Sequence, residues 1–252
     1  MLEPRTVTRA AVTRDTLFGG QLHLTQPARG YRTNVDALLL AHFAAPPGRA
    51  QLAVDLGAGV GAVALALHHR GAAGRLELIE RDDWLCELAR RNLLEAGADG
   101  DVHCQQLGRA PLPPGLAGAA DLVVCNPPFY QEGAHRPSKL PDQRGARFGH
   151  LAPFLDAARH LLKSSRSRAA FVYPAPALPE LLQQASAHGL VPKRLRCVHS
   201  RAEAPARLVL LEVRRARPGG LVMEAPLIEW LGSGQRTAEL RAVTGASAGD
   251  RS

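Results

Sequence analysis

Short apolar runs alternate with amphipathic helical segments along most of this chain. QLAVDLG at 51–57 is typical of a buried strand, and GAVALALHHR at 61–70 is typical of a helix whose alanines and leucines pack on a sheet. RLELIE at 75–80 predicts the next strand, and residues 82–97 carry an apolar stripe at helical spacing that ends at a glycine. The order strand, helix, strand, helix predicts an α/β fold with a parallel sheet.

The same alternation continues toward the carboxyl terminus. We expect further strands near Val102 and at 121–128, 168–174, 195–200 and 207–215, and helices over 153–162 and 178–189. Together the elements predict a doubly wound, mainly parallel sheet with helices on both faces.

The pattern divides the chain into three parts. Residues 1–48 predict a small hairpin followed by a helix that starts near Asn34 or Asp36, either of which is a suitable cap. Residues 49–215 hold the alternating core. Residues 216–252 form a carboxyl-terminal extension whose small, polar tail we expect to fray.

Composition narrows the class of protein. The chain has 252 residues, 46% of them hydrophobic, which is ample for a sizeable core. No apolar run is long enough to cross a membrane and the amino terminus lacks the apolar centre of a signal peptide, so we expect a cytoplasmic protein with no membrane partner. The 31 Lys and Arg against 23 Asp and Glu give a formal charge of +8, which favours nucleic acid as a partner, although a basic composition can also serve solubility alone.

The cysteines and histidines indicate no metal site. Cys86, Cys104, Cys125 and Cys197 are scattered singly, without a Cys-x-x-Cys pair. In a chain without an export signal we expect such cysteines to be reduced and mostly buried. No group of Cys and His residues has the spacing of metal ligands on one helix face, so no metal is predicted.

The strand at 51–57 runs into a glycine loop, DLGAGVG, that opens the following helix. Gly57, Gly59 and Gly61 let a ligand approach the backbone at a helix amino terminus. The same glycines can also serve only a tight strand-to-helix turn. With Ala62 the loop even satisfies the G-x-G-x-x-[G/A] fingerprint of dinucleotide-binding proteins, so more than one class of cofactor is open at this point.

Two acidic residues help to choose between the cofactor classes. Glu80 lies about twenty residues after the loop, where an acid that binds ribose hydroxyls is expected, although it can also be a solvated strand end. Asp55 stands directly before the loop, where its carboxylate would repel a pyrophosphate but attract a cationic amino group. The loop therefore favours a ligand with an ammonium group over a dinucleotide.

The stretch DLVVCNPPFY at 121–130 ends a buried strand with an amide, two prolines and an aromatic ring. Prolines cannot continue a sheet ladder, so this motif is held stiffly at the carboxyl edge, where open α/β sheets bind ligands. The side-chain oxygen of Asn126 and the carbonyl of Pro127 can each accept one N–H of an exocyclic amine, which aims the nitrogen lone pair at an electrophile. Pro128 helps to fix those directions, and Phe129 offers a ring on which a planar base can stack.

The glycine loop and the Asn-Pro-Pro-Phe motif together resemble the class I S-adenosylmethionine-dependent methyltransferases, with motifs similar to D-x-G-x-G-x-G and, in amino-methylating members, [DNS]-P-P-[YFW]. The resemblance implies a Rossmann-like fold with a seven-stranded, mostly parallel sheet, helices on both faces and a final antiparallel strand. The implied cofactor is S-adenosyl-L-methionine, held by Asp55, Gly57, Gly59, Gly61 and Glu80. The implied catalytic residues are Asn126, Pro127, Pro128 and Phe129.

The amino-terminal segment sharpens the resemblance. The run from Gly30 to Arg32 and the helix start after it are similar to the bacterial tRNA (adenine-N6)-methyltransferases of the valine tRNA type, in which such a segment covers the cofactor pocket. The runs 146–148 (Ala-Arg-Phe) and 205–207 (Pro-Ala-Arg) extend the likeness over nearly the whole chain. The candidate cofactor-pocket residues that this adds are Tyr31, Asn34 and Asp36. Where the family commonly has an acid that meets the cofactor adenine, this chain has Gln106, whose amide can still hydrogen-bond the adenine edge.

We therefore expect an N-methyltransferase that acts on an exocyclic amino nitrogen, N6 of adenine in tRNA. The target base must be single-stranded or flipped out to reach the motif. A long basic loop at 131–150 directly follows the motif and is expected to bind the substrate backbone, or to be only a solvated surface loop. The substrate-binding candidates are Phe129, Arg136, Lys139, Arg144 and Arg147.

Two other functions remain open from the sequence. The Asn-Pro-Pro-aromatic motif also resembles that of the protein-glutamine methyltransferases that act on release factors, because an amide nitrogen poses the same chemical problem. Those enzymes usually carry a separate helical amino-terminal domain, which the predicted hairpin does not resemble. The other alternative is a noncatalytic protein that binds S-adenosylmethionine or RNA, which the missing acid near Gln106 makes conceivable.

Overall fold

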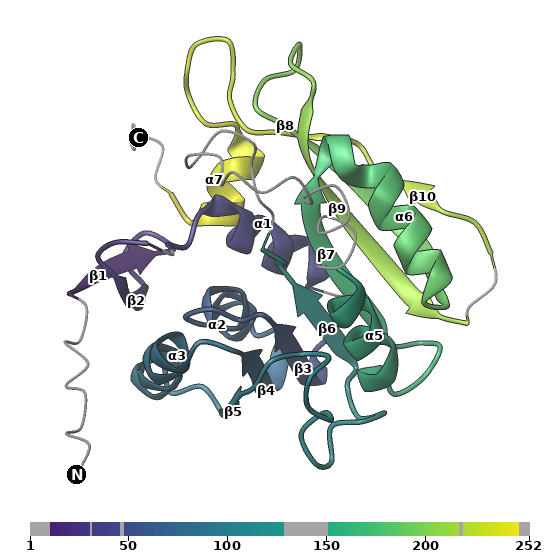
Figure 1. The fold of residues 1–252 in the computed structure, drawn as a ribbon. Helices are drawn as coiled ribbons and strands as arrows, with labels where there is room; N and C mark the ends of the chain where they lie inside the picture. The colour runs from purple at the N-terminus through teal and green to yellow at the C-terminus, as the bar shows by residue number, and fades with distance from the viewer. Residues whose placement is uncertain (1–10, 31, 46–47, 129–150, 217–218, 247–252) are drawn as a thin grey trace, which may run out of the picture.

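The computed structural model describes residues 11–30, 32–45, 48–128, 151–216 and 219–246. Its centre is a nine-stranded sheet in the order β10-β8-β9-β7-β6-β3-β4-β5, with β11 also paired to β8 (Figure 1). Its strands are β3 (Ala50–Leu56), β4 (Ala73–Glu80), β5 (Gly100–Cys104), β6 (Leu122–Cys125), β7 (Arg168–Pro174), β8 (Leu190–His199), β9 (Ala206–Arg215), β10 (Val222–Met223) and β11 (Leu227–Ile228). β9 is antiparallel to both of its neighbours, and all other neighbouring strands are parallel.

Helices cover both faces of this sheet. They are α1 (Val35–Ala44), α2 (Ala62–His69), α3 (Asp83–Glu95), α5 (Ala152–Leu161), the short 3-10 helix η1 (Ala175–Ala177), α6 (Leu178–Ala187) and α7 (Ala238–Thr244). Successive side chains of β6 point alternately into the hydrophobic cores on the two faces of the sheet. Leu122 and Val124 belong to the core with α1, α2 and α3. Val123 and Cys125 belong to the core with α5 and α6. Because successive strand side chains point to opposite faces, a continuous apolar strand such as β6 is buried on both sides.

The predicted α/β fold is confirmed, but the strand count differs. The seven strands β5-β4-β3-β6-β7-β9-β8 form the expected mostly parallel sheet, and β9 is the expected antiparallel strand. The sheet nevertheless has nine strands, because β10 and β11 of the carboxyl-terminal extension pair with β8. Each of them is only two residues long, which is too short to leave an alternating pattern in the sequence.

The amino-terminal segment contains the predicted hairpin and helix. β1 (Val12–Leu17) and β2 (Leu22–Pro27) pair antiparallel as a separate two-stranded sheet. The tip of the hairpin is anchored by Phe18, whose ring stacks on His69 at the end of α2 with 4.3 Å between ring centroids. Asn34 is the cap of α1, since its side-chain oxygen accepts the N–H of Asp36 at 3.0 Å. None of the helices described is long and apolar enough to cross a membrane.

Candidate active site at the carboxyl edge of the sheet

The glycine loop and the Asn-Pro-Pro motif lie side by side at the carboxyl edge of the sheet. β3 and β6 are parallel neighbours, and their last residues Leu56 and Cys125 are paired. Gly57 and Asn126 therefore follow directly at the ends of two adjacent strands. Asn126 is half-buried and Pro127 is buried. None of the residues in the described part of the chain hydrogen-bonds the Asn126 amide, so its oxygen is available to a substrate amine.

The loop needs glycine for both conformation and space. Gly57, Gly59 and Gly61 have left-handed φ values of 67°, 57° and 86°. A Cβ at position 57 would lie 3.0 Å from Cε1 of Phe154, and a Cβ at position 61 would lie 3.0 Å from Cδ2 of Leu78. The glycines therefore let the loop close against α5 on one side and against β4 on the other.

Replacing Gly57 by alanine is expected to weaken cofactor binding by about 10-fold or more, because the loop must move away from Phe154 and adopt a new backbone conformation. Gly71→Ala is the matched control, since Gly71 has a similar φ of 64° and a Cβ there would meet nothing within 4 Å. Isothermal titration of both variants with S-adenosylmethionine tests this. An equal loss of affinity in the two variants would contradict the role given to the contact.

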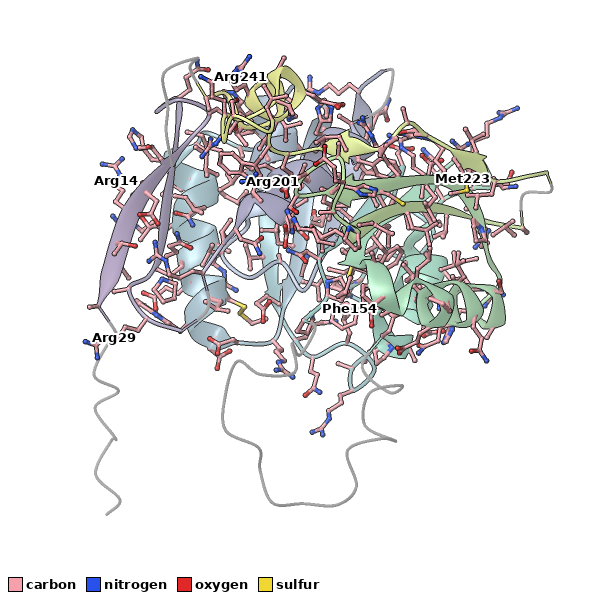
Figure 2. All side chains as sticks on the ribbon, turned by 90° about the horizontal axis from the view of Figure 1, so that it is seen from above. Arg14, Arg29, Phe154, Arg201, Met223 and Arg241 are labelled. Carbon is pink, nitrogen blue, oxygen red and sulfur yellow. A yellow bond between two sulfur atoms is a disulfide. The ribbon has the colours of Figure 1, made fainter. Side chains whose placement is uncertain are left out.

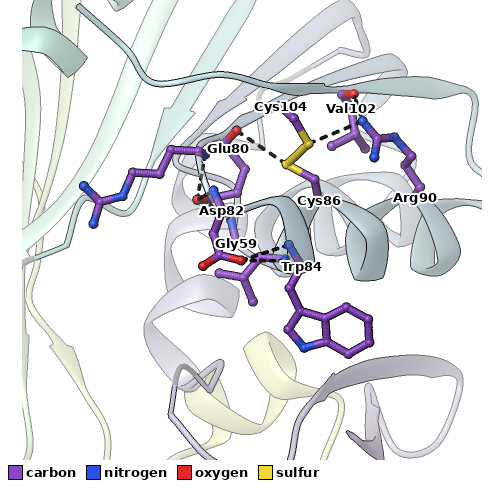
Figure 3. The surroundings of a disulfide bond; sticks show 10 residues. Gly59, Glu80, Asp82, Trp84, Cys86, Arg90, Val102 and Cys104 are labelled. Atoms are coloured by element: carbon purple, nitrogen blue, oxygen red, sulfur yellow. Dashed lines mark hydrogen bonds between the residues drawn. A yellow bond between two sulfur atoms is a disulfide. The ribbon is translucent and has the colours of Figure 1, made fainter. Parts of the chain in front are cut away.

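Glu80 closes the glycine loop through its carboxylate (Figure 3). Oε2 accepts the N–H of Gly59 at 2.9 Å, and Oε1 accepts those of Arg81 at 2.7 Å and Asp82 at 3.0 Å. Asp82 in turn caps α3 by accepting the N–H groups of Trp84 and Leu85. Glu80 thus joins the end of β4 to the loop after β3, which is where the sequence predicts a ribose-binding acid.

Asp55 is the second acid of the site and is fully buried. Its Oδ2 accepts the N–H of Ala64 in the first turns of α2 at 3.2 Å. Burial raises the pKa of Asp55 to about 7, the Ala64 hydrogen bond opposes this rise, and the negative charge of Glu80 adds to it. The carboxylate is therefore poised to ionise when a cation arrives.

The residues of this edge fit the cofactor that the motifs imply. Asp55 and Glu80 are buried carboxylates, and neither forms an ion pair with a residue in the described segments. A buried charge without a partner is costly, so a cationic amino group near Asp55 would be favoured. The backbone of the glycine loop is open to a ligand, and Glu80 retains lone pairs for a hydroxyl group.

The other described candidates for the cofactor pocket lie at the start of α1 and after β5, and their role in cofactor binding stays a prediction. Asn34 and Asp36 line a cavity at the start of α1, together with residues of β9 and of the carboxyl-terminal extension and without the glycine loop. The Asp36 carboxylate is engaged there by Arg207 at 2.9 Å and by Asn34 Nδ2 at 2.8 Å. Gln106 is exposed in the turn after β5, beyond the carboxyl end of that strand.

Several predicted residues lie outside the described part of the chain. They are Tyr31 of the cofactor set and Phe129, Arg136, Lys139, Arg144 and Arg147 of the substrate set. Their roles stay predictions. No group of three or more His, Cys, Asp or Glu residues within the described ranges is arranged to hold a metal ion.

Two residues that sequence reasoning missed support the loop. Asn92 of α3 is fully buried and binds both the backbone N–H and C=O of Thr25 in the hairpin, while its Nδ2 also donates to the carbonyl of Val60 at 2.9 Å. It therefore fastens the hairpin to the glycine loop. Phe154, which contacts Gly57, extends from the start of α5 (Figure 2). The only sequence signal for Asn92 is a polar residue inside an apolar helical stripe.

Replacing Asn92 by alanine is expected to lower the free energy of unfolding by about 2–3 kcal/mol, because Thr25 and Val60 would keep buried backbone groups without partners. Arg91→Ala is the matched control, since Arg91 lies on the exposed face of the same helix and forms an i,i+4 pair with Glu95. Urea unfolding of both variants measures the difference. A cost for Asn92→Ala no larger than the control's would contradict this role.

The cysteines differ from the sequence expectation. Cys86 of α3 and Cys104 of β5 are joined in a disulfide, with their Cα atoms 6.0 Å apart, and Cys104 is exposed (Figure 3). The prediction of single, reduced cysteines is wrong for this pair, because residues 18 positions apart meet only when α3 packs along β5. Cys86 Sγ also lies 3.4 Å from the carbonyl oxygen of Glu80. Cys125 is free and fully buried in β6, as expected of a core residue.

Comparison with known proteins finds methyltransferases, which agrees with the motifs at this edge of the sheet. The family model of the methyltransferase small domain matches residues 33–140. A tRNA1(Val) (adenine(37)-N6)-methyltransferase of Porphyromonas gingivalis is 30% identical over 207 residues, which is 77% of this chain and 78% of that protein. One from Flavobacterium psychrophilum is 29% identical over 148 residues, and this chain spans only 62% of its length. A release factor glutamine methyltransferase of Mycolicibacterium smegmatis is 36% identical over 111 residues, 44% of this chain and 39% of that protein.

Solved structures share the fold. A predicted O-methyltransferase from Agrobacterium tumefaciens aligns with a TM-score of 0.67 at 22% identity, covering 82% of this chain and 94% of that one. The TYW2 protein of M. jannaschii, solved with AdoMet, aligns with a TM-score of 0.55 at 14% identity, covering 82% and 87%. With a relative at 30% identity over most of both chains and an edge that carries the motifs of a class I N-methyltransferase, the chain belongs to the tRNA1(Val) (adenine(37)-N6)-methyltransferase family.

Proposed function

We propose that this enzyme methylates N6 of an adenine in tRNA with S-adenosylmethionine as the methyl donor. The observation that carries the proposal is the register of β3 and β6, which sets the Asn126 amide beside the glycine loop. The relatives named for adenine-N6 methylation of tRNA, the structural neighbour solved with AdoMet and the net charge of +8 support it. We propose the cytoplasm as its location.

The chain's own residues supply binding and orientation. When bound, S-adenosylmethionine supplies an electrophilic methyl group. The glycine loop and Asp55 would hold its amino-acid end, and the Glu80 carboxylate would accept a hydrogen bond from a ribose hydroxyl. Asn126 Oδ1 and the Pro127 carbonyl accept the two N–H groups of the adenine amine, so that its lone pair points at the methyl group. Within the chain outside the described residues, we assign base stacking to Phe129 and backbone contacts to Arg136, Lys139, Arg144 and Arg147.

The test is methyl transfer from radiolabelled S-adenosylmethionine to bulk tRNA from cells that lack the modification, run beside rRNA, DNA and a release factor. Digestion of the product to nucleosides identifies the methylated atom. We expect the label in tRNA as N6-methyladenosine. Label in rRNA or DNA alone would overturn the tRNA assignment, and cofactor binding without transfer to any substrate would favour the noncatalytic alternative.

Glutamine methylation of a release factor is the second candidate. It is favoured by the 36% identity to the mycobacterial release factor enzyme and by the shared need to activate a delocalised amide nitrogen. The match covers less than half of either chain, whereas the tRNA methyltransferase match covers more than three quarters of both. Label in the release factor rather than in tRNA would keep the chemistry of Asn126 and replace the substrate.

A further inference from the structure

An open cavity of about 960 Å³ is lined by four separate parts of the chain. Its walls come from the hairpin tip, the start of α1, the start of β9 and the carboxyl-terminal extension with α7, and Figure 1 shows these segments gathered around α1. The volume lies in the range of small-molecule sites and is large enough for a nucleoside. No role assigned so far to the glycine loop or to Asn126 uses this cavity.

The cavity reaches the same edge of the sheet as the Asn-Pro-Pro motif. Arg207, which lines it, directly precedes Leu208, and Leu208 is paired with Pro174 at the carboxyl end of β7. β7 is in turn the parallel neighbour of β6, whose end leads into Asn126. A substrate strand that presents one base to Asn126 can therefore place a neighbouring base here.

The charges that line the cavity balance one another. Asp36 and Glu229 are each only 4% exposed, and both are bound by Arg207: its Nη1 donates to Asp36 at 2.9 Å and its Nε to Glu229 at 2.7 Å. Arg236 adds a second guanidinium to the wall, so two carboxylates face two cations. This balance favours a neutral, polar ligand over a phosphate group.

The remaining wall is suited to a flat, hydrogen-bonding ring. The Trp230 indole lines the cavity, with the Arg236 guanidinium 5.7 Å from its centroid. Thr33 Oγ1 and Arg236 Nε, both on residues of the wall, are buried and have no hydrogen-bond partner in the described part of the protein. A buried polar group without a partner is destabilising, and a ligand with polar edges would supply the missing hydrogen bonds.

An arginine outside the cavity lies close to Trp230 along the chain path. The N–H of Trp230 donates to the carbonyl of Ser200 at 3.0 Å, so Arg201 stands beside it in the turn after β8. Arg201 is exposed and forms no ion pair with a described residue. A neutral, aromatic interior with a cation outside matches the chemistry of one nucleotide, with its base inside and its phosphate at the rim.

We propose that this cavity binds a second nucleoside of the RNA substrate, next to the target adenosine, with its base on Trp230 and its polar edge at Arg236 and Thr33. The inference rests on the proposed function for its substrate class. It adds a site that selects the sequence or loop shape around the target. It assigns the carboxyl-terminal extension a part in substrate recognition.

Direct RNA binding is the first test, because it does not depend on methyl transfer. The chain has two tryptophans, so Trp84→Phe leaves Trp230 as the only indole. Titration of that variant with unmodified bulk tRNA, in the presence of S-adenosylhomocysteine, is expected to quench the Trp230 fluorescence. A release factor that quenches it while tRNA does not would overturn the RNA assignment, as would no quenching by either.

Kinetics of cavity variants are the second test. Trp230→Ala is expected to raise KM for tRNA by about 5- to 150-fold, the range of one base–aromatic stack, and to leave the affinity for S-adenosylmethionine unchanged. Trp230→Phe should recover most of the loss, and Thr33→Val should raise KM with little change in volume. Leu231→Ala is the control, since Leu231 is 46% exposed and does not line the cavity.

The outcomes separate the two proposals. Methylation of tRNA with an unchanged KM in Trp230→Ala would overturn the cavity proposal and leave the proposed function standing. Quenching by tRNA without methylation of any RNA would overturn the proposed function and leave RNA binding at the cavity. A loss of cofactor affinity in folded Trp230→Ala, checked by thermal unfolding, would overturn the assignment to a substrate nucleoside.

Discussion

Replacing Asn126 by alanine is expected to lower kcat for methyl transfer by about 10²- to 10³-fold, the size of effect seen when one preorganised hydrogen-bonding group is removed from an active site. Without the side-chain oxygen of Asn126, one N–H of the target amine would lack its acceptor. The lone pair of the amine nitrogen would then stay delocalised into the adenine ring. The affinity for S-adenosylmethionine should stay unchanged, because the glycine loop and Glu80 are built on other strands. Single-turnover transfer and isothermal titration measure the two quantities.

Asn126→Asp is the matched control for this experiment. It keeps a side-chain oxygen of nearly the same position, so it should retain far more activity than Asn126→Ala. Pro127 is buried, and its ring keeps the backbone carbonyl in place in both variants. A parallel loss of cofactor affinity in Asn126→Ala would show that the residue holds the cofactor or the loop instead of the amine.

Replacing Asp55 by asparagine is expected to raise the free energy of unfolding of the ligand-free protein at pH 8 by up to about 4 kcal/mol while weakening cofactor binding by about 10-fold or more. The carboxylate of Asp55 is buried, and its pKa is raised from 3.8 to about 7. The folded protein therefore pays a constant cost for the ionised carboxylate once the pH exceeds about 7. Asparagine keeps the acceptor for the Ala64 N–H without the charge, but it no longer attracts an ammonium group.

The pH dependence has a defined sign. Because the folded state holds the Asp55 proton more tightly than the unfolded state does, the contribution of this group to stability is full below about pH 4 and is lost as pH rises to about 7. The stability gained by Asp55→Asn should grow over that interval and level off above it. Cofactor affinity of the wild-type protein should rise with pH through about 7, because the ionised carboxylate attracts the ammonium group, and this rise should be absent in the variant.

Asp121→Asn is the control for both measurements. Asp121 also accepts backbone N–H groups, those of Gln51 and Leu52, but it precedes β6 at the opposite edge of the sheet. Urea unfolding across pH 4 to 8 and titration with S-adenosylmethionine compare the variants. A pH profile of Asp55→Asn that matches the wild-type profile would contradict the assignment of the titrating group.

The sequence by itself determined the α/β class, the helix capped by Asn34, the positions of the glycine loop and the Asn-Pro-Pro motif, and through these motifs the family. Each of these depends on neighbours along the chain: short apolar runs that alternate with helical stripes, a cap next to its helix, glycines where φ is positive and prolines where a strand must stop.

Only the tertiary structure decided that Asn92 fastens the hairpin to the loop, that Phe154 lies against Gly57, that Cys86 meets Cys104 and that the extension adds strands to β8. It also showed that Asn34 and Asp36 line a cavity with the extension. These contacts join residues far apart in the sequence, and a single buried amide or thiol leaves no periodic signal. Their partners are fixed by how helices and strands pack, which local patterns do not specify.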